Sequence, residues 1–343
     1  MSWLFGNGVQ KSVLAQRLAT LKKVVSPAIL AEFTRFCMAS SQFLFEVNIA
    51  DVEKSTSIPR RVLIPVFLRA VKARVFNLVF RVRCQGCQGN IPAPALFDVH
   101  PEMICVVCGT HNHPELDGSV SAVFCLHPSI GKTKKSNQPF EDLPAIEVVN
   151  TQEFRDLFES QHPLPGEFVR VKSMCFLFTD IVGSTATYEN LGDALAFRLV
   201  REHFEILFAA IGQHNGVAIK TIGDAVLASF LSSADGFACA RDIQLRFKAF
   251  NMRPEIKEGC QIRIGLHEGP CVGVTLNNRL DFFGSTVNIA ARVQSFAGPG
   301  QLCVTKKTVQ KHLSRISREG VFTKKSFARL KGIARPVSVL LIN

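Results

Sequence analysis

Strand-length apolar runs alternate with helix-length segments through residues 168–343, and this alternation limits the possible fold more than any other feature of the chain. Apolar residues recur at helical spacing in the longer segments and are contiguous in the shorter ones. The expected elements are a strand at 171–179, a helix at 195–213, strands at 217–222 and 225–230, a helix at about 234–250, a strand pair at 262–266 and 269–275, and a helix at 287–296. The order βαββαβ predicts an α+β, ferredoxin-like domain with a mixed sheet and helices on one face.

The rest of the chain is expected to form three parts. Residues 1–83 predict a helical, winged-helix-like region, although Pro65 weakens one of its helices because an interior proline removes a hydrogen bond. Residues 84–130 carry four clustered cysteines, and residues 131–167, which begin with a basic and polar stretch, are interpreted as a linker. The elements expected in the first part are helices near 10–23, 27–38 and 59–73 and a strand at 75–83.

Composition narrows the class of protein. A hydrophobic content of 47% suffices for packed cores, and a net charge of +12 favours anionic partners such as nucleotides, nucleic acid or an acidic membrane surface. The longest apolar stretch, 62–71, contains a proline and an arginine and is far shorter than the ~20 residues that span a bilayer. The N-terminus lacks the basic and apolar regions of a signal peptide. We therefore expect a cytoplasmic protein without a membrane span, whose eleven cysteines are mostly reduced thiols.

Two aspartates stand beside glycine-containing turns. Asp180 ends the apolar strand in 178–185 (FTDIVGST), and Asp224 lies in the predicted hairpin turn of 220–225 (KTIGDA). If the two strands pair, both carboxylates meet at one end of the sheet, and carboxylate oxygens are the ligands that Mg²⁺ prefers. Backbone N–H groups of the turn formed by Gly183, Ser184 and Thr185 are suited to phosphate oxygens. Taken alone, either aspartate is better explained as a turn or cap residue, but turn chemistry does not explain the two aspartates together with the four further residues described below.

A lysine and a third aspartate form a second candidate pair. Lys220 lies in an otherwise apolar strand, and Asp281 lies in the run 279–284 (RLDFFG). An aspartate accepts hydrogen bonds from the N6 amino group of adenine, and a lysine donates to a ring nitrogen, whereas the O6 acceptor of guanine repels a carboxylate. The alternative reading is an ordinary salt bridge.

Asn288 and Arg292 lie four residues apart on a predicted helix and therefore share a face. Arginine suits the charge that builds on a phosphate oxygen, and asparagine suits the positioning of a ribose oxygen. The alternative for an exposed arginine is a solvated surface position.

These motifs make residues 168–343 resemble the catalytic domain of class III nucleotidyl cyclases. The matching strings are 178–185 (FTDIVGST), 219–225 (IKTIGDA), 263–267 (RIGLH), 280–294 (LDFFGSTVNIAARVQ) and 330–332 (LKG), all in the order that the family has them. The resemblance implies that Asp180 and Asp224, with the carbonyl of Ile181, bind two Mg²⁺ or Mn²⁺ ions. It also implies that Lys220 and Asp281 select adenine over guanine.

The resemblance further implies that Asn288 and Arg292 stabilise the transition state and that Lys331 binds the triphosphate. The implied activity is that of an adenylate cyclase, a phosphorus–oxygen lyase that converts ATP to 3′,5′-cyclic AMP and pyrophosphate for intracellular signalling. Because the family builds each site from two domains and this chain carries both sets of residues, a homodimer is implied. The alternatives are a guanylate cyclase and a catalytically silent nucleotide-binding module.

Two Cys-x-x-Cys knuckles, Cys84 with Cys87 and Cys105 with Cys108, are separated by 17 residues. This spacing is typical of four-cysteine zinc ribbons, and a closed shell of four thiolates indicates a structural Zn²⁺ rather than a catalytic one. A redox pair is the alternative. Residues around this motif also resemble a poorly characterised domain that precedes cyclase domains in bacterial proteins. That resemblance suggests that the N-terminal region regulates the cyclase, in response to an unknown input.

Basic charge, a zinc ribbon and a possible helix–turn–helix at 48–74 raise nucleic acid as a partner. No pattern of base-reading side chains is visible there, so nucleic-acid binding is not the preferred interpretation.

Overall fold

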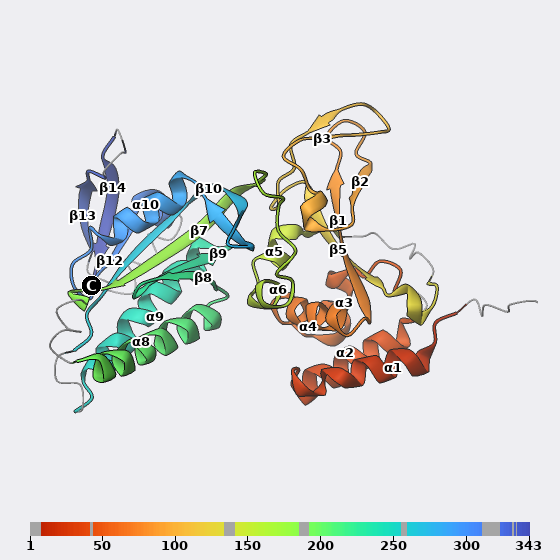
Figure 1. Ribbon diagram of the computed structural model, residues 1–343, viewed down its shortest axis with the longest axis horizontal. Coiled ribbons are helices and arrows are strands. Elements are labelled where there is room, and N and C mark those ends of the chain that lie inside the picture. The colour runs from red at the N-terminus through yellow and green to blue at the C-terminus, as the bar shows by residue number, and fades with distance from the viewer. Residues whose placement is uncertain are drawn as a thin grey trace, which may run out of the picture. The chain divides into compact units, whose positions relative to one another are not determined.

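The computed structural model describes residues 8–41, 44–133, 141–184, 192–254, 259–310, 323–330, 333 and 335–343. The chain divides into two compact units (Figure 1). The first consists of Met1–Arg170 together with Gly273–Leu280, and the second of Val171–Val272 together with Asp281–Asn343. Among the described residues, no helix is both long enough and apolar enough to cross a membrane.

Four helices open the first unit: α1 (Lys11–Ala19), α2 (Pro27–Ala39), α3 (Ile49–Thr56) and α4 (Arg60–Lys72). Helix α4 runs through Pro65 without a break, so the weakness expected there does not end the helix. Its apolar face buries Phe67, whose ring stacks on Phe124 at a centroid distance of 4.9 Å and lies 5.1 Å from Phe76. This aromatic cluster joins α4 to the two central strands of the unit's sheet, and truncating such a ring costs about 3–5 kcal/mol of stability.

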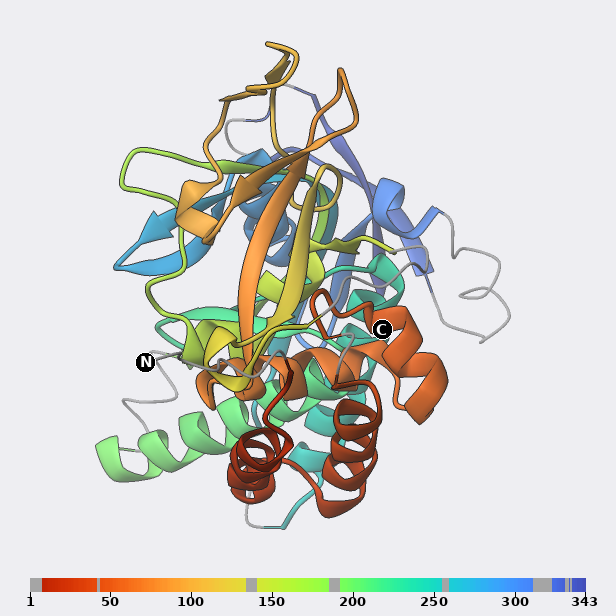
Figure 2. The ribbon, with the colours of Figure 1, turned by 90° about the vertical axis from the view of Figure 1, so that its right-hand side faces the viewer.

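That sheet has the order β2-β1-β5-β6. Its long central pair is antiparallel, with Phe80 opposite Ala122, and it stands over the helical layer in Figure 2. The strands are β1 (Phe76–Arg83), β2 (Asn90–Ala93), β5 (Val120–Leu126) and β6 (Leu143–Pro144), and a separate small pair is β3 (Met103–Ile104) with β4 (His111–Asn112).

Residues 141–167 differ from the linker expected at 131–167. They contain β6, α5 (Ala145–Val149) and α6 (Gln152–Leu157). The Thr151 hydroxyl caps α6 by accepting from the backbone N–H of Phe154, and Ile146, Val148 and Phe154 are buried. Helices of five and six residues are too short to show a period in the sequence, so the segment reads as a linker although it packs as part of the first unit.

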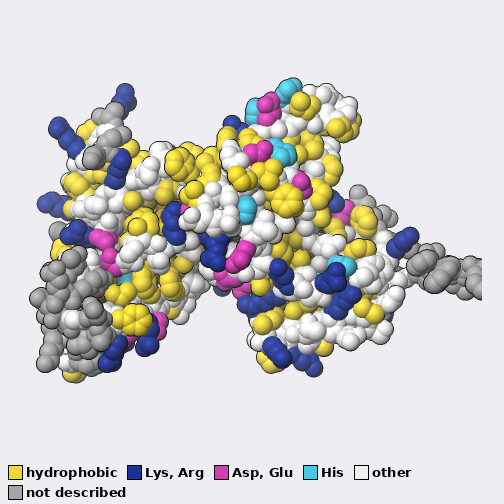
Figure 3. Space-filling view, viewed as in Figure 1, with side chains coloured by type: hydrophobic (Ala, Val, Ile, Leu, Met, Phe, Trp, Pro, Cys, Tyr) yellow, Lys and Arg dark blue, Asp and Glu magenta, His cyan; other side chains and the backbone are white. Residues whose placement is uncertain are grey.

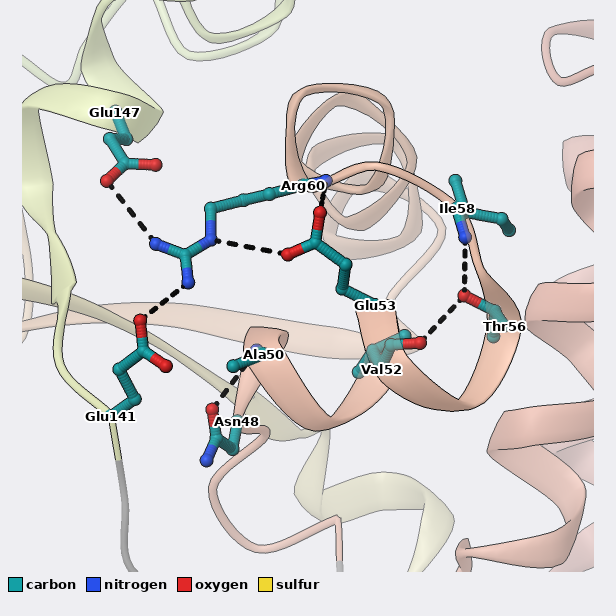
Figure 4. Close-up of polar contacts among 9 residues, drawn as sticks. All are labelled: Asn48, Ala50, Val52, Glu53, Thr56, Ile58, Arg60, Glu141 and Glu147. Atoms are coloured by element: carbon teal, nitrogen blue, oxygen red, sulfur yellow. Dashed lines mark hydrogen bonds and ion pairs between the residues drawn. The ribbon is translucent and has the colours of Figure 1, made fainter.

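The connection between α3 and α4 is held by polar contacts (Figure 4). Asn48 caps α3, and Glu53 accepts from the backbone N–H of Arg60 at 2.8 Å. The Arg60 guanidinium lies 2.7 Å from Glu141 and 3.6 Å from Glu147. Three carboxylates surround this guanidinium, so its charge is not available to a phosphate. This weakens the nucleic-acid alternative at the segment 48–74 that predicted a helix–turn–helix.

The second unit is built on a sheet with the order β13-β14-β12-β10-β7-β9-β8, and β11 pairs with β10. Strand β9 is antiparallel to both β7 and β8. The strands are β7 (Val169–Ile181), β8 (Val217–Ile222), β9 (Ala225–Phe230), β10 (Ile262–Leu276), β11 (Arg279–Phe283), β12 (Leu302–Thr305), β13 (Thr323–Ala328) and β14 (Val337–Ile342).

Helices cover both faces of this sheet, which corrects the prediction of helices on one face. Leu302 and Val304 of β12 join the core formed with α8 (Asp193–Gln213) and α9 (Ser233–Asn251). Cys303, between them, packs instead with Val293 of α10 (Ser285–Gln294). Successive strand residues point to opposite faces, so α8 and α9 lie on one face and α10 on the other, as Figure 1 shows. Nothing in the sequence of the helix predicted at 287–296 indicates which face of the sheet it covers.

The strand pair expected at 262–266 and 269–275 is wrong. Gly269 and Pro270 do not interrupt the chain, and β10 continues from Ile262 to Leu276. Its hairpin partner is β11, which the sequence did not reveal. The turn between them consists of Asn277 and Asn278 with φ of 51° and 57°, as a two-residue type I′ hairpin requires, and an Asn-Asn pair was the available signal.

Candidate functional site

Strand pairing brings Asp180 and Asp224 together. Thr179 of β7 lies opposite Val226 of β9, and its hydroxyl accepts from the Val226 backbone N–H at 3.2 Å. This register places the end of β7 beside the β8–β9 turn. The backbone N–H of Ile181 then donates to Oδ2 of Asp224 at 3.2 Å, so the main chain of Ile181 and both carboxylates share one end of the sheet.

The two carboxylates repel each other electrostatically. The pKa of Asp180 is raised, first by burial and then by the negative charge of Asp224. Gln294 of α10 acts in the opposite direction, because its Nε2 donates to Oδ2 of Asp180 at 3.4 Å. A divalent cation between two close carboxylates removes this repulsion, and the oxygen donor set suits Mg²⁺ or Mn²⁺.

The turn after β7 contains two of the three residues predicted for phosphate binding. Gly183 is exposed and has a φ of +67°, a conformation that favours glycine, and Ser184 is half-buried. Thr185, the third residue predicted for phosphate binding, lies outside the described residues, as does Lys331.

Lys220 and Asp281 form an ion pair across the sheet. Lys220 Nζ lies 2.5 Å from Oδ2 of Asp281, and Oδ1 of the same carboxylate accepts from the backbone N–H of Phe282 at 2.7 Å. The Asp281 side chain is 9% exposed and that of Lys220 is 36% exposed, so the lysine end of the pair is open to solvent. The pair therefore presents a cation next to an oriented carboxylate, which fits both the base-reading interpretation and the ordinary salt bridge.

Asn288 and Arg292 lie on α10, exposed and half-buried respectively. Among the described residues, neither side chain forms a hydrogen bond or an ion pair with Asp180, Asp224, Lys220 or Asp281. The described part of the chain thus contains the two neighbouring aspartates, the Lys220–Asp281 ion pair and two further candidate residues that bond to neither set.

The four cysteines of the first unit converge. The sulfurs of Cys84 and Cys108 are 3.5 Å apart, those of Cys87 and Cys105 are 3.7 Å apart, and all four lie within 4.8 Å of one another. Four sulfurs bound tetrahedrally at ~2.3 Å stand about 3.8 Å apart, so the spacing fits a Zn²⁺ ion. Buried Asn112 links the two knuckles by accepting from the Gln85 N–H and donating to the Met103 carbonyl.

Two residues next to the aspartates were missed by sequence reasoning. Gln294 follows the recognised Asn288 and Arg292 on the same helix, yet an amide alone predicts no role. His203 of α8 donates from Nε2 to the carbonyl oxygen of Asp224 at 3.0 Å. It lies in an apolar helical segment, where a lone histidine is most simply read as part of the core.

Comparison with known proteins gives this geometry a family. The Adenylate and Guanylate cyclase catalytic domain matches residues 167–342, about half of the chain. This chain belongs to that family. Residues 11–160 match a family of unknown function (DUF5939). The N-terminal part of the chain is therefore matched as that family and not as a zinc ribbon.

The relatives that this chain matches include proteins named for either nucleotide. It is 30% identical to "Retinal guanylyl cyclase 1" of Mus musculus over 237 residues, which is 58% of this chain and 21% of the mouse protein. It is 27% identical to "Putative adenylate cyclase 3" of Rhizobium meliloti (strain 1021) over 173 residues, 50% of this chain and 28% of that protein. This chain thus spans only 21% and 28% of the length of these two relatives.

Among solved structures, an "Adenylate/Guanylate Cyclase/Hydrolase" from Silicibacter pomeroyi is 30% identical, with a TM-score of 0.43, and the match covers 50% of this chain and 96% of that one. The family assignment rests on the sequence match to the catalytic domain and not on this superposition.

Proposed function

We propose that this cyclase is an adenylate cyclase, which converts ATP to 3′,5′-cyclic AMP and pyrophosphate with two divalent cations per site. The observation that carries the proposal is the contact between Lys220 and Asp281. A carboxylate whose Oδ1 is already oriented by the Phe282 N–H, beside a solvent-accessible ammonium group, matches the donor and acceptor positions of adenine N6 and a ring nitrogen.

A guanylate cyclase is the second candidate, and the 30% identity to a retinal guanylyl cyclase favours it. Guanine places an O6 acceptor where adenine has an amino donor, so it brings a lone pair toward the ionised Asp281. The hydrogen bond from adenine N6 to this charged acceptor is worth about 1.5–3 kcal/mol and is missing with guanine, which corresponds to roughly a 10- to 150-fold preference for ATP.

Each set of side chains has a distinct task in this proposal. Asp180, Asp224 and the Ile181 carbonyl hold the cations, which when bound lower the pKa of the ribose 3′-hydroxyl and neutralise the leaving group. The backbone of 183–185 and Lys331 hold phosphate oxygens. Asn288 orients the ribose, and Arg292 stabilises the charge on the α-phosphate as the bond from O3′ to Pα forms and the bond from Pα to the pyrophosphate oxygen breaks.

A homodimer with shared sites is part of the proposal. The side chains of Asn288 and Arg292 have no hydrogen-bond or ion-pair partner among the described residues, so they are free to contact a substrate held by a second chain. A two-fold axis that sets α10 of one protomer against the Asp180 end of the other completes two equivalent sites.

We also propose that the four cysteines hold a structural Zn²⁺ ion, with Cys84, Cys87, Cys105 and Cys108 as its ligands in a zinc-ribbon module. The sulfur spacing supports this role, as does the cluster itself, which contains no ligand other than these four cysteines among the residues that the structure describes. His111, which lies nearby in sequence, contacts Glu102 at 2.6 Å instead of a cysteine.

Regulation by the first unit is the last element of the proposal. Residues 273–280, at the tip of the β10–β11 hairpin, belong to the first unit. There Arg155 of α6 donates to the Leu280 carbonyl at 2.6 Å, and Glu159 pairs with Arg279 at 2.9 Å. Leu280 directly precedes Asp281 in the chain, so a shift of this hairpin moves the residue that reads the base.

The experiment that tests the proposal is product formation by purified protein with ATP and Mn²⁺. We expect Asp180→Ala and Asp224→Ala each to lower cyclic AMP production at least ~10³-fold, because each removes a cation ligand. The matched control is Asp242→Ala, which removes an α9 aspartate that pairs with His214 and Arg246. Activity that survives both site substitutions rejects the cation assignment.

A further inference from the structure

We propose that His203 is a positioning residue that fixes the turn carrying Asp224 in the geometry required to bind a divalent cation. This inference rests on the proposed cation site at Asp180 and Asp224. It concerns a helix residue that contacts no substrate atom and acts only through the peptide group of Asp224.

The contact is direct and fully buried. His203 is 0% exposed, and its Nε2 lies 3.0 Å from the Asp224 carbonyl oxygen. A carbonyl oxygen only accepts, so Nε2 carries the proton and donates. The turn that carries Asp224 also contains Gly223, whose φ of +62° favours glycine. Gly223 and Asp224 form the two-residue loop between β8 and β9 and belong to neither strand.

The turn is therefore restrained from two sides. From β7, the Ile181 N–H binds the Asp224 carboxylate, and the Thr179 hydroxyl binds the Val226 N–H. From α8, His203 binds the Asp224 carbonyl. The β7 contacts fix the position of the Asp224 carboxylate. The bond from His203 fixes the rotation of the peptide group that contains the Asp224 carbonyl, and this rotation sets the direction of the side chain.

Packing alone does not explain a histidine at this position. Its ring is held edge-on by Phe204 and Phe247, with centroids 5.2 and 5.5 Å away, so the surroundings are apolar. Its Nδ1 is buried and has no hydrogen-bond partner among the described residues. An unpaired buried polar atom costs about 1–3 kcal/mol, a cost that leucine or methionine would avoid in the same space. The bond to Asp224 is what the histidine supplies and an apolar residue cannot.

The test compares variants that keep or remove the donor. His203→Gln places an amide N–H close to the position of Nε2, whereas His203→Met fills similar space without a donor. His203→Asn, whose shorter amide does not reach the carbonyl, replaces the methionine variant if that variant is insoluble. The matched control is His267→Met, which removes another buried histidine of the same unit, one that bonds to Thr305 and not to the aspartates.

The measurements are Mn²⁺ binding by electron paramagnetic resonance without nucleotide, and the Mn²⁺ dependence of the initial rate with ATP. We expect His203→Met to raise the Mn²⁺ dissociation constant and the half-saturating Mn²⁺ concentration about tenfold, with the KM for ATP at saturating Mn²⁺ little changed. His203→Gln returns both values to within about threefold of the wild type.

A purely structural histidine gives another result. His203→Met then lowers the melting temperature as His267→Met does and leaves Mn²⁺ affinity unchanged, which overturns the proposal. Wild-type protein that binds no Mn²⁺ overturns it as well. Wild-type protein that binds Mn²⁺ but forms no cyclic nucleotide contradicts the proposed function alone, because the binding measurement still decides the role of His203.

Discussion

Buried charges are costly unless they are paired, and Asp281 is buried with one partner and one backbone donor. The same reasoning applies to Asp180, whose pKa is raised by burial and by the negative charge of Asp224, with partial compensation from the Gln294 hydrogen bond and the positive charge of Arg263. At the scale of single residues, the second unit thus holds one carboxylate paired with a lysine, and two carboxylates that form no ion pair with any residue that the structure describes. The lysine–aspartate pair suits the recognition of a nucleobase, and the two neighbouring aspartates suit the binding of a divalent cation.

Substitution of Asp281 by asparagine tests the base-reading role. Asp281→Asn is expected to lower kcat/KM for ATP by about 10- to 100-fold and to leave that for GTP within a few-fold, because only adenine loses a charged acceptor. Steady-state rates with each nucleotide measure this. Asp242→Asn, which neutralises an ion-paired aspartate of α9, is the control. An equal loss for both nucleotides would mean that the carboxylate supports the fold and does not read the base.

A second prediction at this scale concerns His267. Burial, assisted by the positive charge of Lys307, lowers its pKa to about 4. The folded-state pKa is therefore below the ordinary value near 6.5, so the neutral ring contributes stability that is fully present above ~6.5 and is lost as the pH falls toward 4. The loss amounts to roughly 3 kcal/mol at pH 4. Urea unfolding at several pH values should show a steeper decline for wild type than for His267→Gln, and parallel curves would contradict the assignment.

At the scale of elements, the register between strands determines where the candidate site lies. The pairing that brings Asp180 and Asp224 to one end of the sheet can be predicted from the sequence. Pairing the run that ends at Asp180 with the one that follows Asp224 requires only the apolar pattern and a glycine turn, and β7 and β9 do pair in that way. The longer-range facts do not follow. The side of the sheet that α10 covers, the continuity of β10 through Pro270 and the donor at His203 all depend on packing between segments far apart in the chain.

The two cysteine knuckles lead to a third prediction. Val106 and Val107, between the last two cysteines, are 94% and 80% exposed, and apolar, histidine and acidic side chains gather at that end of the first unit in Figure 3. A knuckle so exposed has little core to stabilise it, so we expect the proposed Zn²⁺ ion to stabilise it instead. We expect one Zn²⁺ per chain by elemental analysis, and removal by a chelator or by Cys84→Ser should lower the melting temperature of the first unit by roughly 10 °C.

Cys125→Ser is the control for that experiment, since this half-buried cysteine of β5 lies outside the cluster. Its zinc content should equal that of the wild type. Full zinc content in Cys84→Ser, or unchanged stability after chelation, would favour a redox pair over a structural zinc site.

At the scale of the whole molecule, the separation of the candidate residues into two sets predicts complementation between inactive chains. Under the proposed roles, Asp180→Ala lacks a cation ligand and Arg292→Ala lacks the charge that stabilises the transition state. In a mixture, half of the dimers combine the two variants and retain one of two intact sites, so activity should recover to about a quarter of the wild-type value. Co-purified mixtures assayed with ATP measure this recovery, and a mixture as inactive as its components would place all catalytic groups of a site in one protomer.

The measurement that tests the central claim most directly is the ratio of kcat/KM for ATP to that for GTP, determined with the purified wild-type chain and Mn²⁺ at several protein concentrations. An adenylate cyclase with sites shared between protomers predicts a ratio of at least ~10 and a specific activity that rises with protein concentration. A ratio below one, with cyclic GMP as the main product, would contradict the role given to Lys220 and Asp281.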